Sequence, residues 1–363
     1  MSRHRSSQAT GTVPVRTATT RHAFLVYANR SGSTLLSAQL SEHIDTEQLL
    51  VIPEFRLVEF LFHVGDEKAR RLSSAAMRSM IEDDRQIAAN LGLTHDELLV
   101  GLETTAGEGI RMKLETILEA YAANNVPAVK PEVVLWKWGN AATYVDEIGE
   151  SFPEARFVHV IRDGRAVVNS LLTSESPYFP GEDLARGSTL DGVHHWKSSL
   201  QRNTGPARAG LDSLVVRYSD LVEAPQEVSR SVKGFLGLGE ELGRHGDDQT
   251  FKVSPKEEGI HRLVTESPQS DRIDGWQTEL APWRRFVVEH AARGELREWG
   301  YDLFLIDVST FKGMTWLIRA HLERILGLCK WAIRRLRHYR PRLTVRLLRL
   351  RIRAWAATRQ TRI

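Results

Sequence analysis

Two segments far apart in the sequence share one pattern, in which a short apolar run leads into a basic turn and then into a stretch with helical periodicity. They occupy residues 24–40 and 157–172. Each apolar run is too short to cross a membrane but has the length of a buried strand. The start of the following helix presents free backbone N–H groups and the positive end of its dipole, which together attract anions. Each segment therefore predicts a strand–turn–helix unit that holds a phosphate group.

The first turn has the sequence Asn-Arg-Ser-Gly-Ser-Thr at residues 29–34. Gly32 lets the backbone approach an anion closely, because a Cβ atom would stand in the way. Ser33 or Thr34 is expected to cap the following helix, which buries Leu36. For this segment alone, an ordinary strand–turn–helix with a hydroxyl cap and no ligand explains the residues equally well.

The second turn brings together two residue types that bind phosphate. Arg162 ends the second apolar run, and Ser170 follows two helical turns later. Arginine offers a planar, permanently charged fork for phosphate oxygens, and serine adds a neutral donor. We expect the two side chains to converge on a second phosphate. In the alternative interpretation, Arg162 and Asp163 form a surface ion pair that contributes about 1 kcal/mol or less.

Together the two segments resemble the sulfotransferases that use 3′-phosphoadenosine 5′-phosphosulfate (PAPS). The resemblance covers residues 23–302 and is strongest to the tyrosylprotein and related Golgi-type or bacterial branch. That branch has Arg in the loop where cytosolic aryl and steroid sulfotransferases usually have Lys. The resemblance implies that the first turn binds the 5′-phosphosulfate and the second turn the 3′-phosphate. The residues that it assigns to the nucleotide are Arg30, Ser31, Gly32, Ser33, Thr34, Leu35, Arg162, Ser170 and Tyr218.

Three further positions fit the same branch. Glu54 follows a predicted second strand, where the branch has its catalytic glutamate, and Lys137 ends a predicted strand, where the branch has its catalytic lysine. Tyr218 follows another strand, where the family has a Tyr near the nucleotide. Cytosolic sulfotransferases use a His two residues after the equivalent Lys, and this chain has Gly139 there. Glu54 is therefore the better candidate for the general base.

Each of these three residues also has a purely structural interpretation. Glu54 is an acidic residue near a helix start, where the helix dipole favours it. Lys137 is a charge at the end of a strand, where it can be solvated. Tyr218 is of a residue type that more often packs in a core than stacks on a base.

The chemistry of sulfuryl transfer suits these assignments. A highly charged group moves in line between two oxygen atoms, so the protein mainly positions the reactants and stabilises charge. In the resembled scheme, Arg30 and Lys137 neutralise charge on the bridging oxygen and the leaving phosphate. Glu54 accepts the proton of the acceptor hydroxyl, a role that contributes about 10²–10⁴-fold. The scheme requires no metal ion.

Composition indicates a globular protein from a reducing compartment. The chain has 363 residues, of which 42% are hydrophobic and 26% charged. Its single cysteine, Cys329, excludes an intramolecular disulfide. Residues 1–22 are rich in Ser, Thr and Arg and lack the apolar core of a secretory signal. No apolar run is long enough for a membrane span, so we expect a cytoplasmic location.

Alternating strand and helix patterns predict an α/β fold with a P-loop-like, mostly parallel sheet flanked by helices. We divide the chain into a disordered tail at residues 1–22, a sulfotransferase domain at residues 23–302 and a basic amphipathic helical tail at residues 303–363. Within the domain, residues 56–128 form a predicted helical insertion, of the kind that shapes the acceptor pocket in the resembled family. The polar loop at residues 239–275 is long enough to suggest a lid over the nucleotide.

Two local predictions concern the chain after the second turn. Residues 200–211 are expected to form a loop. A helix capped by Asp191 carries His194 and His195, which we interpret as structural or substrate-lining side chains.

The C-terminal tail concentrates positive charge. Residues 303–363 contain 15 Lys and Arg against 2 Asp and Glu, which leaves 34 basic and 44 acidic residues in the remainder of the chain. An apolar face at helical spacing, together with Trp316 and Trp331, suits a helix that lies in an anionic membrane interface. An oligomerisation helix is the alternative; a nucleic-acid-binding tail is disfavoured, because the body matches no nucleic-acid-binding module. The apolar face consists of Leu322, Ile325, Leu326, Cys329, Ile333 and Leu336.

The sequence therefore predicts a cytoplasmic PAPS-dependent sulfotransferase, peripheral to a membrane, that acts on a hydroxyl of a sugar, a lipid or a tyrosine. A P-loop kinase or other NTPase is the first alternative, in which Asp163 would hold magnesium. Against it, the first turn lacks the GxxxxGK[ST] pattern that places a Lys on the β- and γ-phosphates. A non-catalytic scaffold that works through its basic tail is the second alternative.

Overall fold

The structure is a computed structural model of the chain. It describes residues 20–84, 86–125, 130–175, 183–239, 242, 271–304 and 308–338, with side chains as far as residue 333. Most of the expected N-terminal tail, most of the predicted lid loop and the end of the basic tail lie outside the described residues.

Five parallel strands form one sheet in the order β2-β3-β1-β4-β5. The first four are short runs of mostly buried, apolar residues, as is usual where helices cover both faces of a parallel sheet. The predicted α/β fold with a parallel sheet is confirmed. The strands are β1 (Arg21–Tyr27), β2 (Leu49–Ile52), β3 (Val133–Lys137), β4 (Arg156–Ile161) and β5 (Ser213–Arg217).

The chain order of the strands reverses at β1, which lies between β3 and β4. In open α/β sheets, ligands bind in the crevice outside the carboxyl ends of the strands at such a reversal. The register sets Tyr27, the last residue of β1, beside Val160 of β4. The two turns that carry Arg30 and Arg162 therefore leave the same edge of the sheet as neighbours.

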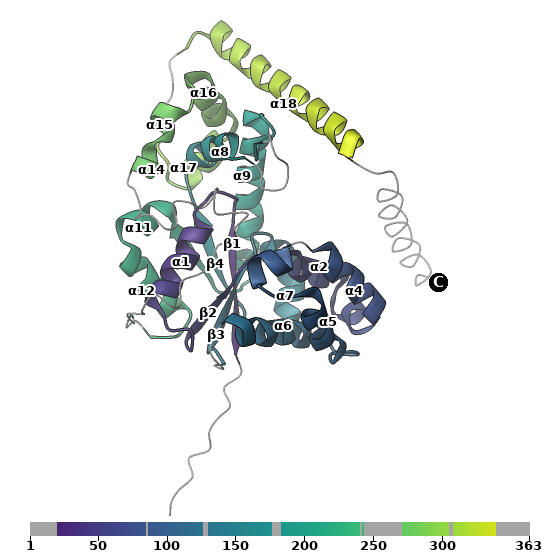
Figure 1. Ribbon diagram of the computed structural model, residues 1–363. Helices are drawn as coiled ribbons and strands as arrows, with labels where there is room; N and C mark the ends of the chain where they lie inside the picture. The colour runs from purple at the N-terminus through teal and green to yellow at the C-terminus, as the bar shows by residue number, and fades with distance from the viewer. Residues whose placement is uncertain are drawn as a thin grey trace, which may run out of the picture.

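Alternate residues of β1 enter two different cores, as the period of a strand requires. Leu25 and Tyr27 belong to the core between the sheet and one layer of helices, and Phe24 and Val26 to the core on the other face. Figure 1 shows these layers on opposite sides of the sheet. The first layer consists of α1 (Ser33–His43), α11 (Tyr218–Glu223) and α12 (Pro225–Phe235).

The second layer is built by helices between β2 and β3, where the helical insertion is predicted. Gly65, Gly92 and Gly107 all have positive φ angles and mark interruptions between these helices. A capping box of Thr94 and Glu97 fixes the start of one of them. The helices are α2 (Arg56–Val64), α3 (Asp66–Arg70), α4 (Ser74–Asp83), a π-helical turn (Ile87–Leu91), α5 (His95–Glu103) and α6 (Ile110–Asn125).

Helices that follow β4 cover the ends of β1 and β4 and form a third core around Val167, Trp196 and Val288. The short helices between β3 and β4 pack into the core of the second layer. After β3 come a 3-10 helix (Ala141–Tyr144) and α7 (Val145–Ser151), and after β4 come α8 (Gly164–Thr173), α9 (Thr189–Asn203) and α10 (Gly205–Arg208). The C-terminal group is α14 (Asp271–Asp274), α15 (Trp276–Glu279), α16 (Pro282–Ala291), α17 (Arg293–Glu298) and α18 (Thr310–His338).

Two local predictions in this region were wrong. The α9 helix begins at Thr189, because the extended Ser188 accepts the backbone N–H of Asp191 and acts as the cap in place of Asp191. The expected loop at residues 200–211 is mostly helical, since α9 continues to Asn203 and α10 follows directly. Cap choice depends on the backbone angles of one residue, and residues 188–191 include three residues of capping type, Ser188, Thr189 and Asp191.

A buried ionic cluster fixes the second turn against the C-terminal helices. Asp163 caps α8, and its carboxylate accepts a hydrogen bond of 2.6 Å from Arg165. Arg165 donates a second hydrogen bond of 2.6 Å to Glu289 of α16. The guanidinium of Arg165 lies 4.0 Å from the centre of the Trp276 ring. The alternative surface pair of Arg162 with Asp163 is therefore not formed, because Asp163 pairs with Arg165.

Candidate functional site

The turn between β1 and α1 has an unusual backbone. Arg30 and Gly32 both have positive φ angles, of 71° and 98°. Gly32 is the residue before the helix, and within the described chain no side chain caps α1. The expectation that Ser33 or Thr34 caps the helix was wrong, because both lie inside its first turn and are buried. The first backbone N–H groups of α1 thus keep the donor role that suits an anion.

The two predicted phosphate-binding turns meet at the switch point of the sheet. The Arg30 Nε atom donates to the Ser170 hydroxyl at 2.9 Å, and Arg162 donates to the Arg30 carbonyl at 3.1 Å. A second nitrogen of Arg162 donates to the Arg272 carbonyl of α14 at 2.7 Å. Residues from the turns after β1 and β4, from α8 and from α14 therefore converge, although they are far apart in the sequence.

The electrostatics of this cluster favour an anion. Burial lowers the pKa of Arg30 to about 10, and the positive charge of Arg162 acts in the same direction. Burial also lowers the pKa of Arg162. Among the described residues, the buried Ser31 hydroxyl and the Arg162 Nε atom have no hydrogen-bond partner. Two close cations and two unused donors at one helix start are the features of a phosphate site.

Tyr218 is the first residue of α11 and contacts both turns. The Arg162 guanidinium carbon lies 4.0 Å from the centre of its ring. A Cβ atom on Gly32 would come within 2.5 Å of the same ring. Two features therefore require glycine at residue 32. The backbone there is left-handed, and the Tyr218 ring occupies the space that a Cβ atom would need.

Replacing Gly32 with alanine is expected to destabilise the protein by about 1–3 kcal/mol, because the new methyl group strains the backbone and displaces the Tyr218 ring. Chemical denaturation measures the change. Gly149 of α7 provides the control, since an added Cβ there meets nothing within 4 Å. Gly149→Ala should leave stability unchanged or raise it, and equal effects of the two changes would contradict the packing at Gly32.

A second cluster joins the ends of β1, β2 and β3. Glu54 follows β2, and its carboxylate accepts from the Tyr27 hydroxyl at 2.7 Å. The Lys137 ammonium lies 5.6 Å from the centre of the Tyr27 ring. Lys137 is only 7% exposed, so its interpretation as a solvated charge was wrong. The Asn90 side chain donates to the Glu54 carbonyl at 2.6 Å and fixes the backbone there.

Gly139 explains why this chain has no histidine two residues after Lys137. A Cβ atom at residue 139 would lie 3.1 Å from the Tyr27 ring. The tyrosine occupies the space that a side chain at residue 139 would need. A side chain at residue 139 would therefore crowd the Tyr27 ring, which bonds Glu54 and lies near Lys137.

Sequence reasoning missed Tyr27 and left His195 open between a structural and a substrate-lining role. Tyr27 lies within an apolar strand run and had no signal except its position before the turn. His195 was expected to be structural or substrate-lining, and its Nε2 atom accepts the backbone N–H of Asn29 at 3.1 Å. Burial lowers the pKa of His195 to about 4, so the ring is neutral at pH 7 and can accept this bond. The neighbouring His194 is exposed.

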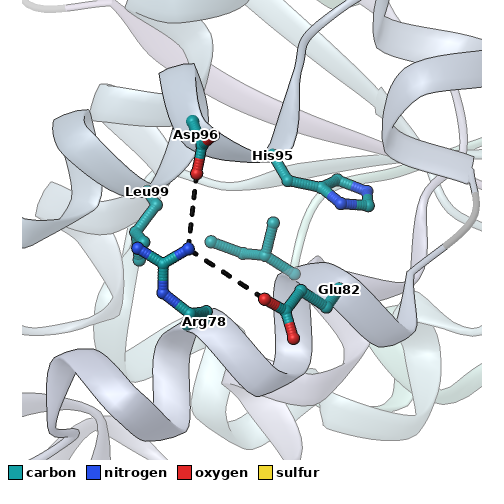
Figure 2. A pocket seen from close by; sticks show the side chains of 6 residues that line it. Arg78, Glu82, His95, Asp96 and Leu99 are labelled. Atoms are coloured by element: carbon teal, nitrogen blue, oxygen red, sulfur yellow. Dashed lines mark hydrogen bonds and ion pairs between the residues drawn. The ribbon is translucent and has the colours of Figure 1, made fainter.

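A separate cavity of about 260 Å³ lies within the helical insertion. Figure 2 shows Arg78 between the carboxylates of Glu82 and Asp96, with His95 nearby. None of the predicted site residues lines it. The cavity is therefore not part of the cluster at the switch point.

The fold and the two arginine-bearing turns define an α/β protein with a candidate anion-binding site at its topological switch point. The chain belongs to the sulfotransferase family, because the family model described as "Sulfotransferase family" matches residues 23–241. That range contains both turns, Glu54, Lys137 and Tyr218.

Curated relatives come from the protein-tyrosine sulfotransferases. Protein-tyrosine sulfotransferase 1 of Danio rerio is 27% identical over 214 residues, which cover 58% of this chain and 51% of that protein. Protein-tyrosine sulfotransferase of Drosophila melanogaster is 25% identical over 221 residues, with 58% of this chain and 36% of that protein covered. The chain thus spans about half or less of the length of these relatives.

Two solved structures share the fold. The sulfotransferase domain of the Synechococcus PCC 7002 olefin synthase aligns with a TM-score of 0.52 and 20% identity over 78% of this chain and 96% of that domain. The sulfotransferase domain of the curacin biosynthetic pathway aligns with a TM-score of 0.50 and 20% identity. The alignment covers 78% of this chain and 99% of that domain. Family and fold together support sulfuryl transfer.

No described helix has the length and hydropathy that crossing a bilayer demands. Within the same residues, no group of three or more His, Cys, Asp or Glu side chains is arranged to hold a metal ion.

Proposed function

We propose that the protein is a sulfotransferase that takes its sulfuryl group from PAPS and transfers it to an acceptor hydroxyl. The observation that supports this most directly is the meeting of Arg30, Ser170 and Arg162 at the switch point. The resemblance assigns these residues to the two phosphates of the nucleotide. Membership of the sulfotransferase family supports the same assignment.

The chemistry of the donor groups fits a nucleotide with two separate phosphates. In this proposal, the 5′ end lies on the turn at residues 30–35, where the N–H groups of α1 and the unpartnered Ser31 hydroxyl are available. Arg162 and Ser170 hold the 3′-phosphate. Tyr218, already stacked on Arg162, lies beside the nucleotide. Bound phosphates would offset the mutual repulsion of Arg30 and Arg162.

The second cluster supplies the groups for transfer. PAPS provides the sulfuryl group and leaves as the 3′,5′-bisphosphate. Glu54 accepts the proton of the attacking hydroxyl, and Tyr27 holds the Glu54 carboxylate in one orientation. Lys137 and Arg30 balance negative charge on the leaving side. The proposed scheme uses no metal ion.

The acceptor is proposed only as a hydroxyl of a tyrosine, a sugar or a lipid. Relatives named protein-tyrosine sulfotransferases favour tyrosine. We further propose a cytoplasmic location, in keeping with a chain whose one cysteine is exposed.

The contacts of Asp163 in the second turn argue against the kinase alternative. A kinase of this type would use Asp163 to hold magnesium, but Asp163 caps α8 and is paired with the buried Arg165. No described feature favours that alternative over sulfuryl transfer.

Thermal unfolding of the full chain tests the proposed function. The desulfated product, 3′-phosphoadenosine 5′-phosphate, should raise the melting temperature, since a ligand at 100 times its Kd stabilises a protein by about 2.7 kcal/mol. Arg162→Gln should lose most of this shift. Arg156→Gln is the matched control. Arg156 is the first residue of β4, whereas Arg162 follows the last residue of the same strand, so the two arginines lie at opposite ends of it. A shift with ATP–Mg²⁺ alone, or no shift with either ligand, would overturn the proposal.

A further inference from the structure

Helix α18 docks on the domain through a face of small residues. Gly313, Ala320 and Gly327 are buried and recur every seven residues. A Cβ atom on Gly327 would come within 2.5 Å of the Arg186 carbonyl, so the backbones approach closely there. Trp316 packs against Phe286 of α16 beside this face. The docked face thus lies against α9 and α16, and Figure 1 shows α18 along the outside of the domain.

Ion pairs fix α18 in this orientation. Arg324 pairs with Asp191 of α9 at 2.9 Å, and Glu323 pairs with Arg284 of α16 at 3.0 Å. Trp331 lies under the Arg186 guanidinium at 5.1 Å. Trp316 and Trp331 therefore contact the domain, through Phe286 and Arg186.

The opposite face of α18 is apolar and exposed. Successive side chains of this face lie one, three, four or seven residues apart and form one stripe, on the side of the helix opposite Gly313 and Gly327. Their exposed fractions lie between 49% and 81%. Scattered single apolar residues are normal on a surface, whereas a continuous stripe on one helix marks a contact surface. The stripe consists of Phe311, Met314, Ile318, Leu322, Ile325, Leu326 and Ile333.

Positive charge borders this stripe. Lys312, Arg319 and Lys330 are exposed and lie between the stripe and the docked face. The sequence beyond the helix, residues 339–363, adds eight Lys and Arg and no Asp or Glu. A second copy of α18, or the chain's own residues 339–363, would bring positive charge against positive charge. An anionic lipid surface supplies both the apolar layer and the opposite charge.

We propose that α18 binds the protein to an anionic lipid membrane, with the stripe from Phe311 to Ile333 in the boundary between headgroups and acyl chains. The helix lies in the plane of the interface and keeps its opposite face on α9 and α16. This proposal is independent of the proposed sulfuryl transfer, because it involves none of the residues at the switch point.

Co-sedimentation of the full chain with vesicles tests the proposal. Vesicles of phosphatidylglycerol and phosphatidylcholine should bind the protein, and pure phosphatidylcholine should bind it weakly. Leu322→Ser with Ile325→Ser should weaken binding by about tenfold or more. Lys312→Gln and Lys330→Gln should each weaken it about fivefold, or roughly 1 kcal/mol per charge near the surface. Because these side chains are exposed, unfolding temperatures should not change.

Val100→Ser is the matched control, because Val100 is an exposed apolar residue on α5 with 65% exposure. It should leave vesicle binding unchanged. Absence of binding to anionic vesicles would overturn the proposal. So would vesicle binding that is unchanged in the paired serine variant. Binding that is lost on removal of residues 339–363, but not on substitution within α18, would also overturn it. A dimer in lipid-free buffer that the paired variant dissociates would assign the stripe to a second copy instead.

Discussion

Replacing Glu54 with glutamine is expected to lower kcat by about 10²–10⁴-fold, the usual contribution of a general base. Glutamine keeps an oxygen that can accept from the Tyr27 hydroxyl, so the cluster with Lys137 should remain intact. It cannot take the proton of the acceptor hydroxyl. The measurement is transfer of labelled sulfuryl from PAPS to an acceptor on which the unmodified protein is active.

Glu47→Gln is the control for this experiment. Glu47 is exposed and lies just before β2, whereas Glu54 follows the carboxyl end of the same strand. This change should leave kcat unaltered. Binding of 3′-phosphoadenosine 5′-phosphate should be unchanged in both variants, because neither residue belongs to the arginine cluster. A Glu54→Gln protein with normal kcat would remove Glu54 from the role of base.

Replacing Arg165 with methionine is expected to reduce the free energy of unfolding by about 3–5 kcal/mol. The change leaves Glu289, which is 2% exposed, without its ionic partner, and an unpaired buried charge is costly. Asp163 loses the same partner at the start of α8. Urea denaturation measures the effect as a lower midpoint with an unchanged slope.

Two companion variants make this result specific. Arg165→Met with Glu289→Gln should recover part of the lost stability, since glutamine removes the unpaired charge and keeps an acceptor for the Phe304 N–H. Arg71→Met removes an exposed pair with Glu67 on the surface of the insertion and should leave the midpoint unchanged. Similar losses from Arg165→Met and Arg71→Met would show that burial of the cluster contributes nothing.

Local periodicity accounts for the parts of the fold that could be predicted. Apolar runs such as residues 157–161 form buried strands, because a central parallel strand is covered on both faces. Arg30 and Arg162 were recognised because each lies in the turn that follows such a run. The roles of Arg30 and Arg162 as nucleotide ligands stay predictions. The same is true of the roles proposed for Glu54, Lys137 and Tyr218.

Helix ends were the weakest predictions. Asp191 and Ser188 are both good capping residues, and only the backbone conformation at Ser188 decides between them. The same holds at α1, where the left-handed Gly32 precedes the helix and moves Ser33 and Thr34 inside it. These choices depend on how the preceding strand or turn approaches the helix.

The sequence by itself determined the local units of this protein: the strands, the two basic turns and an amphipathic C-terminal helix. Only the tertiary structure decided which of these units meet. Arg30 reaches Ser170 because β1 and β4 are paired. Tyr27, Glu54 and Lys137 meet because β3 pairs with both β1 and β2. Likewise, the packing of α9 and α16 decides which face of α18 is covered. Spacing along the chain fixes the period of an element, whereas strand order and helix docking depend on contacts between distant residues.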